Sequence, residues 1–503
     1  MISNMPILSL LIWTPILGGL ILLFLPNKVN LIKISSVVLA FFIFILSIIL
    51  LINFDSTQYS LQYIEKHIWI RNLNINYHLA IDGFSLSFIL LTTFITLLTI
   101  IYNFSEARDL DNKYNAYFLF LEGLLLGVFC SFDSILFYIF FEAMLIPLFL
   151  IIGIWGGPNR VYATMKFFIY TLFGSVLMLV AILYLSFKAN SFYILDFYNL
   201  YLNLDIQIFL FLAFMIAFGI KIPMWPVHTW LPDAHVEAPS SGSVILAAIL
   251  LKVGGYGMIR FLLPIAPDAG LYLNTFLIPL SLIAIIYISF VAIAQQDMKK
   301  LIAYSSVAHM GFVTLGIFLV FNSIDSNQTI NSINHLGLQG AVMQMISHGL
   351  ISAGLFMCIG IIYSRTKSRM IYDQSGIAQV MPLFSALMMF FLLSNSGLPG
   401  TSGFVGEFMV LIASSKQNFL YAVLASSTLV LAASYSLWLG KRVLFGEISG
   451  NNTNSMKAMN VYEFWPLLIL VIFILIFGLK PGFVLDISEQ SSLHMIRIIS
   501  GKY

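Results

Sequence analysis

The sequence predicts an all-α polytopic membrane protein with about fourteen transmembrane helices. Of its 503 residues, 60% are hydrophobic and only 9% are charged, and the mean hydropathy is +0.96. The apolar residues form continuous runs of about 17 to 25 residues, the length that a helix needs to cross a bilayer. These runs are continuous rather than alternating, which excludes membrane strands as their structure.

The runs follow one another along almost the whole chain. We place the spans near residues 7–25, 34–54, 84–104, 116–131, 134–154, 166–187, 207–227, 242–262, 273–294, 301–321, 337–363, 381–411, 419–440 and 463–479. The first run has neither a basic flank nor an A-x-A-like cleavage site, so we expect it to be retained as a span. Of the 24 Lys and Arg residues, fourteen, including Lys299, fall on the side expected to be inside. Eight, including Arg260, fall on the other side, and Lys221 and Lys252 remain in the membrane, which agrees with the positive-inside rule.

Two spans contain residues that interrupt helices. In the seventh span, Pro223 and Pro226 follow Lys221, and in the twelfth, the stretch SNSGLPGTSG precedes Glu407. Proline removes a backbone donor, and a break at membrane depth is tolerated only inside protein or beside a hydrated cavity. The breaks lie five spans apart, which predicts two inverted five-helix repeats, spans 4–8 and 9–13. The expected divisions are 1–115, an N-terminal three-helix segment; 116–262, the first half; 273–444, the second half; and 463–503, a last span and tail.

Five ionisable residues lie in these apolar runs: Glu122, Glu142, Lys221, Lys252 and Glu407. A charge at the bilayer centre costs roughly 2.5 to 3.5 kcal/mol on insertion scales, which favours a functional role for such residues. Glu142 and Lys221 are natural partners, with a structural carboxyl as the alternative for Glu142. Lys252 could instead snorkel, Glu407 could be a helix-end carboxylate, and Glu122 fits a structural or an accessory role equally well.

Histidines of the central spans add groups that titrate near neutrality. His309 and His348 lie on neighbouring predicted helices, between Lys252 and Glu407 in chain order, which suggests a relay, with ordinary packing as the alternative. His228, Asp233 and His235 follow the first break and form either a polar exit or a capping cluster.

Several classes of site lack the residues they need. The only cysteines, Cys130 and Cys358, lie in separate spans, so iron–sulfur and zinc sites have no ligand set. His335 and His348 are thirteen residues apart, near the spacing of paired haem ligands, but no matching pair exists on a second helix. The chain has neither G-x-G-x-x-G nor G-x-x-x-x-G-K, and no basic cluster interleaved with aromatics, which argues against nucleotide and nucleic-acid binding.

Four stretches resemble one family closely: HTWLPDAHVEAPSSGSVILAAILLKVGGYGMIRF, KKLIAYSSVAHMG, ISHGLISAGLFMCIG and LPGTSGFVGEF. They are similar to the chain 4, or M-type, antiporter-like subunits of NADH–quinone oxidoreductase, respiratory complex I, and the resemblance covers about residues 80 to 445. It implies a fourteen-span proton-translocating subunit with no redox centre of its own. Glu142 and Lys221 match the family's coupling pair, and Lys252 its central lysine. His309 and His348 match the second-half relay, and Glu407 its terminal group, where the sibling subunits are expected to carry lysine.

The resemblance also implies a setting for the chain. NADH and quinone would be used by the complex, with flavin mononucleotide and iron–sulfur clusters in other subunits and no cofactor in this chain. Its partners would be membrane-arm subunits, with the chain 2-type and chain 5-type antiporter-like subunits on either side, in a mitochondrial or bacterial inner membrane. A multisubunit cation/proton antiporter is the alternative function, and an assembly scaffold with structural charges is a third.

Overall fold

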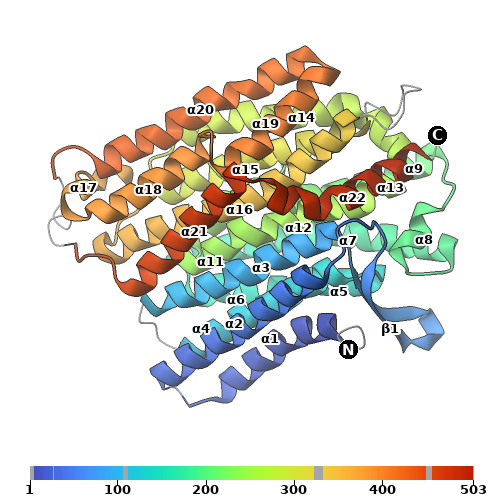
Figure 1. Ribbon diagram of the computed structural model, residues 1–503, viewed down its shortest axis with the longest axis horizontal. Coiled ribbons are helices and arrows are strands. Elements are labelled where there is room, and N and C mark those ends of the chain that lie inside the picture. Colours follow the sequence, from blue (N-terminus) through green and yellow to red (C-terminus); the bar gives the residue numbers. More distant parts are fainter. Residues whose placement is uncertain (1–4, 27, 106–110, 322–331, 449–455, 502–503) are drawn as a thin grey trace.

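The computed structural model shows a bundle of long, roughly parallel helices (Figure 1) and describes residues 5–26, 28–105, 111–321, 332–448 and 456–501. Within these residues, thirteen helices are long and apolar enough to cross a membrane. The predicted fold class, a mostly helical membrane protein, is confirmed. The inverted relation between the two halves stays a prediction.

The spanning helices follow the expected order. Their bounds are α1 Ile7–Phe24, α2 Val29–Asn53, α3 Gly83–Tyr102, α4 Asp111–Cys130, α5 Ser134–Ala143, α6 Leu145–Trp155, α7 Arg160–Ala189, α9 Leu204–Lys221, α14 Pro267–Ile293, α15 Met298–Phe318, α16 Ser332–Thr366, α18 Pro382–Asn395, α19 Ser402–Gln417, α20 Phe419–Leu444 and α21 Val461–Leu479. The eighth span is a continuous helical segment made of α11 Ser240–Ile245, η4 Leu246–Leu250, α12 Leu251–Gly257, η5 Met258–Leu262 and α13 Leu263–Ile265, in which η4 and η5 are π-helical. Three further helices are short, α8 Ile194–Tyr198, α10 Trp230–Glu237 and α17 Ile377–Val380, and the 19-residue α22 Gly482–Ser500 follows the last span.

Both predicted interruptions are present, and each has a local cause. The seventh span ends at Lys221, six residues before its expected end, because Pro223 follows and the chain turns before α10. The twelfth span is two helices, α18 and α19, separated by a turn in which Gly397 and Gly400 have φ of 76° and 90°. The fifth span is also divided, because Pro147 has no N–H to donate to the preceding turn.

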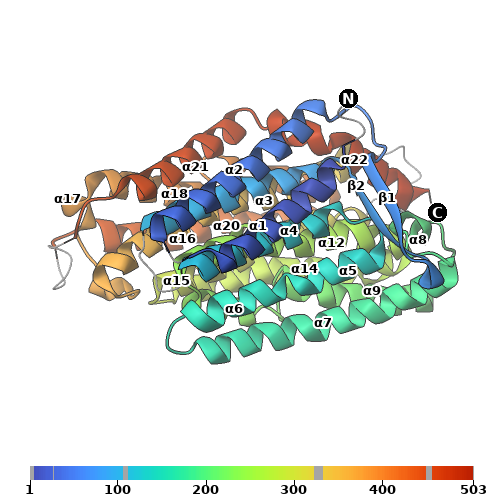
Figure 2. The ribbon, with the colours of Figure 1, turned by 90° about the horizontal axis from the view of Figure 1, so that it is seen from below.

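The segment between the second and third spans forms an antiparallel hairpin, β1 Gln62–Ile70 and β2 Ile75–Ile81, with His67 opposite Tyr77. This hairpin lies outside the predicted spans, and the sequence analysis did not identify it. Asp133 connects it to the bundle: its carboxylate accepts from the Asn76 N–H (2.9 Å) and also caps α5. The hairpin, α8, the start of α1 and the end of α22 lie at one end of the bundle (Figures 1 and 2).

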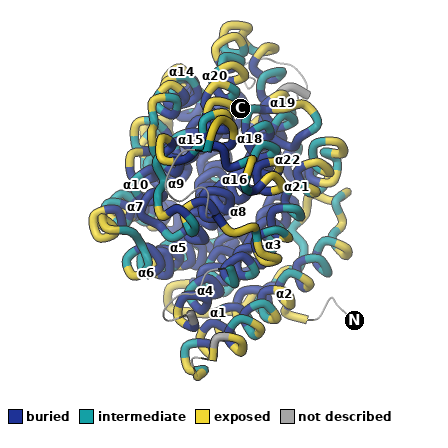
Figure 3. Tube along the Cα trace, turned by 90° about the vertical axis from the view of Figure 1, so that its left-hand side faces the viewer, coloured by how far each residue is buried: buried dark blue, intermediate teal, exposed yellow. Residues whose placement is uncertain are grey.

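Burial increases toward the centre of the bundle, where α16 lies among its neighbours (Figure 3). The most apolar windows of the eighth span and of α16 are entirely buried, whereas only 28% of those of α2 and α21 is buried. The outer helices therefore present apolar side chains to lipid. The central helices carry polar side chains that must find partners inside the protein.

Candidate functional site

The six residues singled out from the sequence lie on six different helices of the bundle. Glu142 is on α5, Lys221 ends α9, Lys252 is on α12, His309 is on α15, His348 is on α16 and Glu407 is on α19. All except Glu142, which is partly buried, are at most 4% exposed. Ionisable groups buried this deeply need hydrogen-bond or charge partners, so their contacts indicate what the site can do.

Lys252 lies directly after the π-helical turn η4. Its Nζ donates a hydrogen bond to the carbonyl of Ala247 (2.7 Å) and lies 2.7 Å from Nδ1 of His348. A π-helical turn widens the helix by one residue and is frequent at functional sites. No sequence pattern indicated this π-helical turn. The same Lys252 ammonium group therefore contacts both the Ala247 oxygen of its own span and the His348 ring. The contact with His348 holds Lys252 against α16.

A second cluster joins α15, α16 and α19. Nδ1 of His309 lies 2.8 Å from Oε1 of Glu407, and Nε2 of Gln344 donates to the same oxygen at 3.1 Å. The Tyr435 hydroxyl lies 3.3 Å from the other ring nitrogen of His309. The His309 and His348 ring centroids are 6.0 Å apart, which brings the two clusters next to each other.

The turn between α18 and α19 places the Glu407 carboxylate. A Cβ built on Gly397 would come within 3.3 Å of Oε2 of Glu407, so the glycine turn lies directly against this carboxylate. Asn395, at the end of α18, donates from Nδ2 to the Ser436 hydroxyl (3.1 Å) and fastens the turn to α20. The interruption therefore places a glycine turn against a buried carboxylate.

Glu142 and Lys221 are neighbours, but the described residues show no ion pair between them within 4.0 Å. The Lys221 ammonium lies 4.7 Å from the ring centroid of Phe141 and 5.9 Å from that of Phe167. The Glu142 carboxyl faces the Ser175 hydroxyl and Lys221. Aromatic faces stabilise a desolvated cation without fixing it to one acceptor, which leaves Lys221 able to turn toward Glu142.

The polar residues after the first break do not form one cluster. Asp233 on α10 makes an ion pair with Lys166 of α7 at 2.7 Å. His235 is fully buried and stacks on Phe356 of α16, with ring centroids 4.4 Å apart. Neither ring nitrogen of His235 has a hydrogen-bond partner among the described residues, and Nδ1 of His228 has none either.

Glu122 is 1% exposed on α4, and within the described part of the chain neither of its carboxyl oxygens has a hydrogen-bond partner. No hydrogen bond or ion pair among the described residues joins it to the clusters above, which separates it from the other four ionisable residues of the apolar runs. Among the described residues, no group of three or more His, Cys, Asp and Glu side chains could hold a metal ion.

Sequence reasoning missed several polar residues. Gln344 and Tyr435 contact the cluster but carry no charge at neutral pH, so nothing distinguished them from ordinary polar residues of a span. Lys299 was assigned to a loop, but it is 3% exposed and donates to the Ala238 carbonyl at 2.6 Å. Arg260, which was assigned to the outer side, is likewise 3% exposed and pairs with Asp82 at 2.7 Å. Its position inside the apolar stretch GYGMIRFLLPI was the signal that could have identified it.

Comparisons with known proteins agree with this architecture. The family described as "NADH:quinone oxidoreductase/Mrp antiporter, TM" matches residues 131–432. The chain is 46% identical over 470 residues to the NADH-quinone oxidoreductase subunit M of Rhodobacter capsulatus, covering 90% of this chain and 88% of that one. It is 42% identical over 492 residues to the NADH-ubiquinone oxidoreductase chain 4 of Marchantia polymorpha, covering 97% of each. It also resembles a chain of the structure of respiratory complex I from Thermus thermophilus, with a TM-score of 0.86, 29% identity, and coverage of 97% and 99%.

Proposed function

Because the chain belongs to the NADH:quinone oxidoreductase/Mrp antiporter family, we propose that it is the chain 4, or M-type, proton-translocating membrane subunit of an NADH–quinone oxidoreductase. It works as part of an enzyme complex that uses NADH and quinone. Flavin mononucleotide and the iron–sulfur clusters belong to other subunits, and this chain binds no cofactor. It resides in an energy-transducing membrane, the inner membrane of a mitochondrion or of a bacterium.

The observation that carries the proposal is the line of buried groups from Lys252 to Glu407. An ammonium proton on Lys252 can pass to Nδ1 of His348 along a contact of 2.7 Å, and His309 exchanges a proton with Glu407 along a contact of 2.8 Å. The centroids of the two rings are 6.0 Å apart, so the transfer between them requires a bridging water. The other two steps each move a proton between groups at hydrogen-bond distance.

Residues of the first half control the charge next to this line. When Lys221 turns from the Phe141 ring toward Glu142, the pair forms; when it turns away, the two charges separate. A charge that moves in a buried, poorly screened environment acts strongly on its neighbours, because the effective dielectric constant there is well below that of water. The protonation of Glu142 thereby changes the field at the central lysine.

A polar cavity of about 640 Å³ supplies protons from the end of the bundle where α7 begins. Its lining includes Asp233, Glu237, Asp297, Lys300 and Arg369. A second cavity of about 320 Å³ shares Glu237 and Arg369 and adds the buried Lys299. Polar cavities of this size hold water, and water conducts protons toward the buried groups.

The chain lies in the membrane arm of the complex, between the chain 2-type and chain 5-type antiporter-like subunits. Residues 116–262 and 273–444 are its two inverted halves, and the segments 1–115 and 463–503 enclose them. Lys221 and Lys252 belong to the first half, and His309, His348 and Glu407 to the second. The proposed path therefore crosses the boundary between the halves, at the contact of Lys252 with His348.

Two measurements test the proposal. A tag on this chain should purify NADH-oxidising peripheral subunits; purification of antiporter subunits alone would favour the cation/proton antiporter. In membrane vesicles, Lys252→Met should abolish NADH-driven quenching of an acridine dye, whereas Lys416→Met, at an exposed lysine near the end of α19, should leave it unchanged. Normal quenching by Lys252→Met at matched complex content would support a scaffold role instead.

A further inference from the structure

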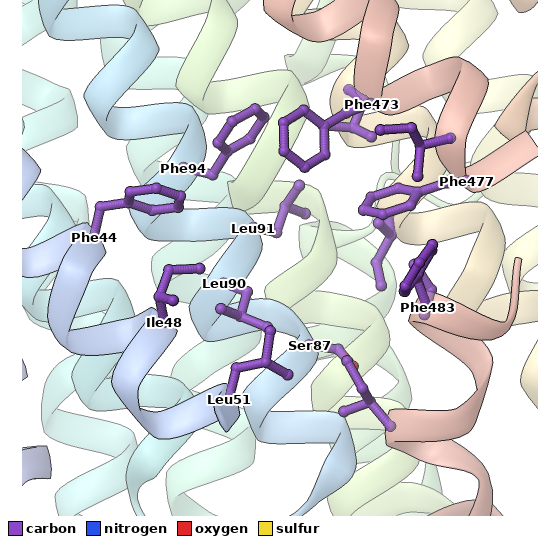
Figure 4. Close-up of a pocket in the computed structure, with 15 residues that line it drawn as sticks. Phe44, Ile48, Leu51, Ser87, Leu90, Leu91, Phe94, Phe473, Phe477 and Phe483 are labelled. Carbon is purple, nitrogen blue, oxygen red and sulfur yellow. The ribbon is translucent and has the colours of Figure 1, made fainter. Parts of the chain in front are cut away.

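An apolar cavity of about 320 Å³ lies between α2, α3, α16, α21 and α22, away from the polar line (Figure 4). Figure 4 shows Phe44 and Ile48 of α2 on one side and Phe473 and Phe477 of α21 on the other, with Leu90 of α3 between them. Of the fifteen lining residues only Ser87 is polar, and its hydroxyl donates to the Gly83 carbonyl within its own helix (2.8 Å). The cavity therefore offers no free hydrogen-bonding group to a ligand, which favours an apolar one.

The position of the cavity determines what can fill it. Its walls belong to α2 and α21, whose most apolar windows are mostly unburied. At its margin Ile476 is 38% exposed and Phe483 is 59% exposed, so the cavity is open at the surface of the bundle. That surface faces hydrocarbon in a bilayer. A cavity of apolar side chains stays free of water, and its volume is at the lower end of the range for ligand pockets, roughly 300 to 1,000 Å³.

The charges at the cavity mouth match a lipid headgroup. The exposed Lys480 lies between α21 and α22, one turn before Phe483, whose N–H donates to the Lys480 carbonyl (3.4 Å). The exposed Asp486 follows on α22, and its carboxylate lies over Gly482. The inner face of α22 carries apolar residues to the cavity and its outer face carries charges, as in helices that lie at a membrane surface. Lys480 and Asp486 stand before and after Phe483 in the chain, so a cation and an anion are available at this margin for the two charges of a zwitterionic headgroup.

We propose that this cavity binds one acyl chain of a zwitterionic phospholipid, with the lipid phosphate beside Lys480 and its ammonium group beside Asp486. The chain would fill the space between the rings of α2 and α21. Because the chain comes from bilayer hydrocarbon and not from water, its binding rests on close packing against these rings and on the headgroup contacts.

The inner wall of the cavity connects this lipid to the polar line. Ile346 and Leu350 of α16 line the cavity and stand on either side of His348 in sequence. Between them, Gly349 is packed so tightly that a Cβ there would lie 3.0 Å from both the Leu91 side chain and the Ala248 carbonyl. An acyl chain in the cavity supports α16 at the turn that carries His348. This consequence, unlike the binding site itself, rests on the proposed function.

Photolabelling of the purified complex tests the binding site. The probe is a phosphatidylethanolamine with a diazirine in one acyl chain, and adducts are located by mass spectrometry. We expect adducts on residues of α2 and α21 at the cavity, reduced severalfold by Ile48→Trp, because Ile48 lines the cavity and the larger indole fills the space that the acyl chain would occupy. Ile45→Trp, on the exposed side of α2, is the matched control and should leave labelling unchanged. Equal labelling in both variants, or cross-links from the cavity to a neighbouring subunit, would overturn the site.

Two further arms identify the ligand and its effect. Lys480→Gln should reduce labelling by the phospholipid probe; a diazirine fatty acid that labels the cavity equally well would overturn the phospholipid assignment. Removal of lipid should reduce dye quenching by the wild-type complex, and added phosphatidylethanolamine should restore it, whereas Ile48→Trp should not respond to the added lipid. A normal response of Ile48→Trp would reject the supporting role and leave the labelling result intact. Failure of the proposed function would instead appear as normal quenching by Lys252→Met.

Discussion

The Glu407→Gln variant tests the path where its contacts are most direct. The carboxylate of Glu407 accepts a hydrogen bond from Nε2 of Gln344 (3.1 Å) and lies 2.8 Å from Nδ1 of His309. The amide is nearly isosteric, so its oxygen can still accept the hydrogen bond from Gln344 and the packing of α19 is preserved. It cannot accept a proton or stabilise a charged imidazole as a carboxylate does.

The size of the effect follows from the type of hydrogen bond. Bonds to charged groups contribute roughly 1.5 to 3 kcal/mol, and neutral bonds roughly 0.5 to 1.5 kcal/mol. Replacing one type by the other weakens the contact with His309 by roughly 1.25 kcal/mol, the difference between the midpoints of these ranges, which is about eightfold in an equilibrium constant. Proton translocation should fall at least about tenfold, because the terminal acceptor is lost as well.

The assay is acridine-dye quenching and quinone reductase turnover in vesicles with matched complex content. Glu407→Lys should retain part of the quenching, since lysine is also protonatable, and Glu407→Ala should lose it. If the two residues act as one unit, His309→Gln combined with Glu407→Gln should be no worse than either single variant. Equal activity of the alanine and lysine variants, or normal quenching by Glu407→Gln, would refute the role of this carboxylate.

Three further predictions concern other parts of the chain. Glu142→Gln should leave the complex assembled but nearly abolish quenching and slow quinone reductase turnover, whereas Glu142→Asp should keep more activity; normal quenching by the Gln variant would make Glu142 structural. Arg260→Met should destabilise the subunit by about 3 to 5 kcal/mol, because it leaves Asp82 buried without its partner, and adding Asp82→Asn should recover part of the loss in a thermal scan. Burial lowers the pKa of His78 to about 4 and raises the pKa of Asp133 to about 6, so His78 makes stability rise from pH 4 to 6.5, while Asp133 makes it fall from pH 3.8 to 6. His78→Asn should therefore make the slope of melting temperature against pH more negative, Asp133→Asn should make it more positive, and identical slopes would contradict both assignments.

The spans were predictable because lipid imposes one simple condition on them. A membrane-spanning segment must make all its backbone hydrogen bonds within one helix and must be long enough to cross the bilayer. Such a helix therefore appears in the sequence as a long, continuous run of apolar residues. The two interruptions were visible for a related reason, since proline and glycine act on the backbone itself. The hairpin of β1 and β2 was not predicted, because its residues lie outside the membrane and carry no such constraint. The π-helical turn before Lys252 depends on packing that the sequence does not display.

The cost of burying charge in a membrane also decides which residues of the site could be predicted from the sequence. Lys252 and Glu407 stood out because a charge in an apolar run is expensive. Gln344 contacts Glu407 directly, but burying an uncharged amide in the membrane costs less free energy than burying a charge. Its presence in a span therefore did not indicate a function. Arg260 and Lys299 were assigned to loops because each lies near the end of a run, where a charge is ordinarily solvated. Only the fold shows that both are buried.

The two parts of the path differ in a way that bears on its mechanism. Lys252 and His348 are in direct contact, as are His309 and Glu407, whereas Lys221 rests on aromatic rings without an ion pair to Glu142 within 4.0 Å in the described structure. In the proposed path, the contacts from Lys252 to Glu407 suit proton transfer, whereas Lys221 is placed to change the charge next to them. These parts are mechanically joined at Gly254 of α12, where a Cβ would come within 2.6 Å of the Ile222 backbone nitrogen, next to Lys221. With no space at this contact, a movement of the end of α9 that turns Lys221 toward Glu142 must also displace the helix that holds Lys252 against His348.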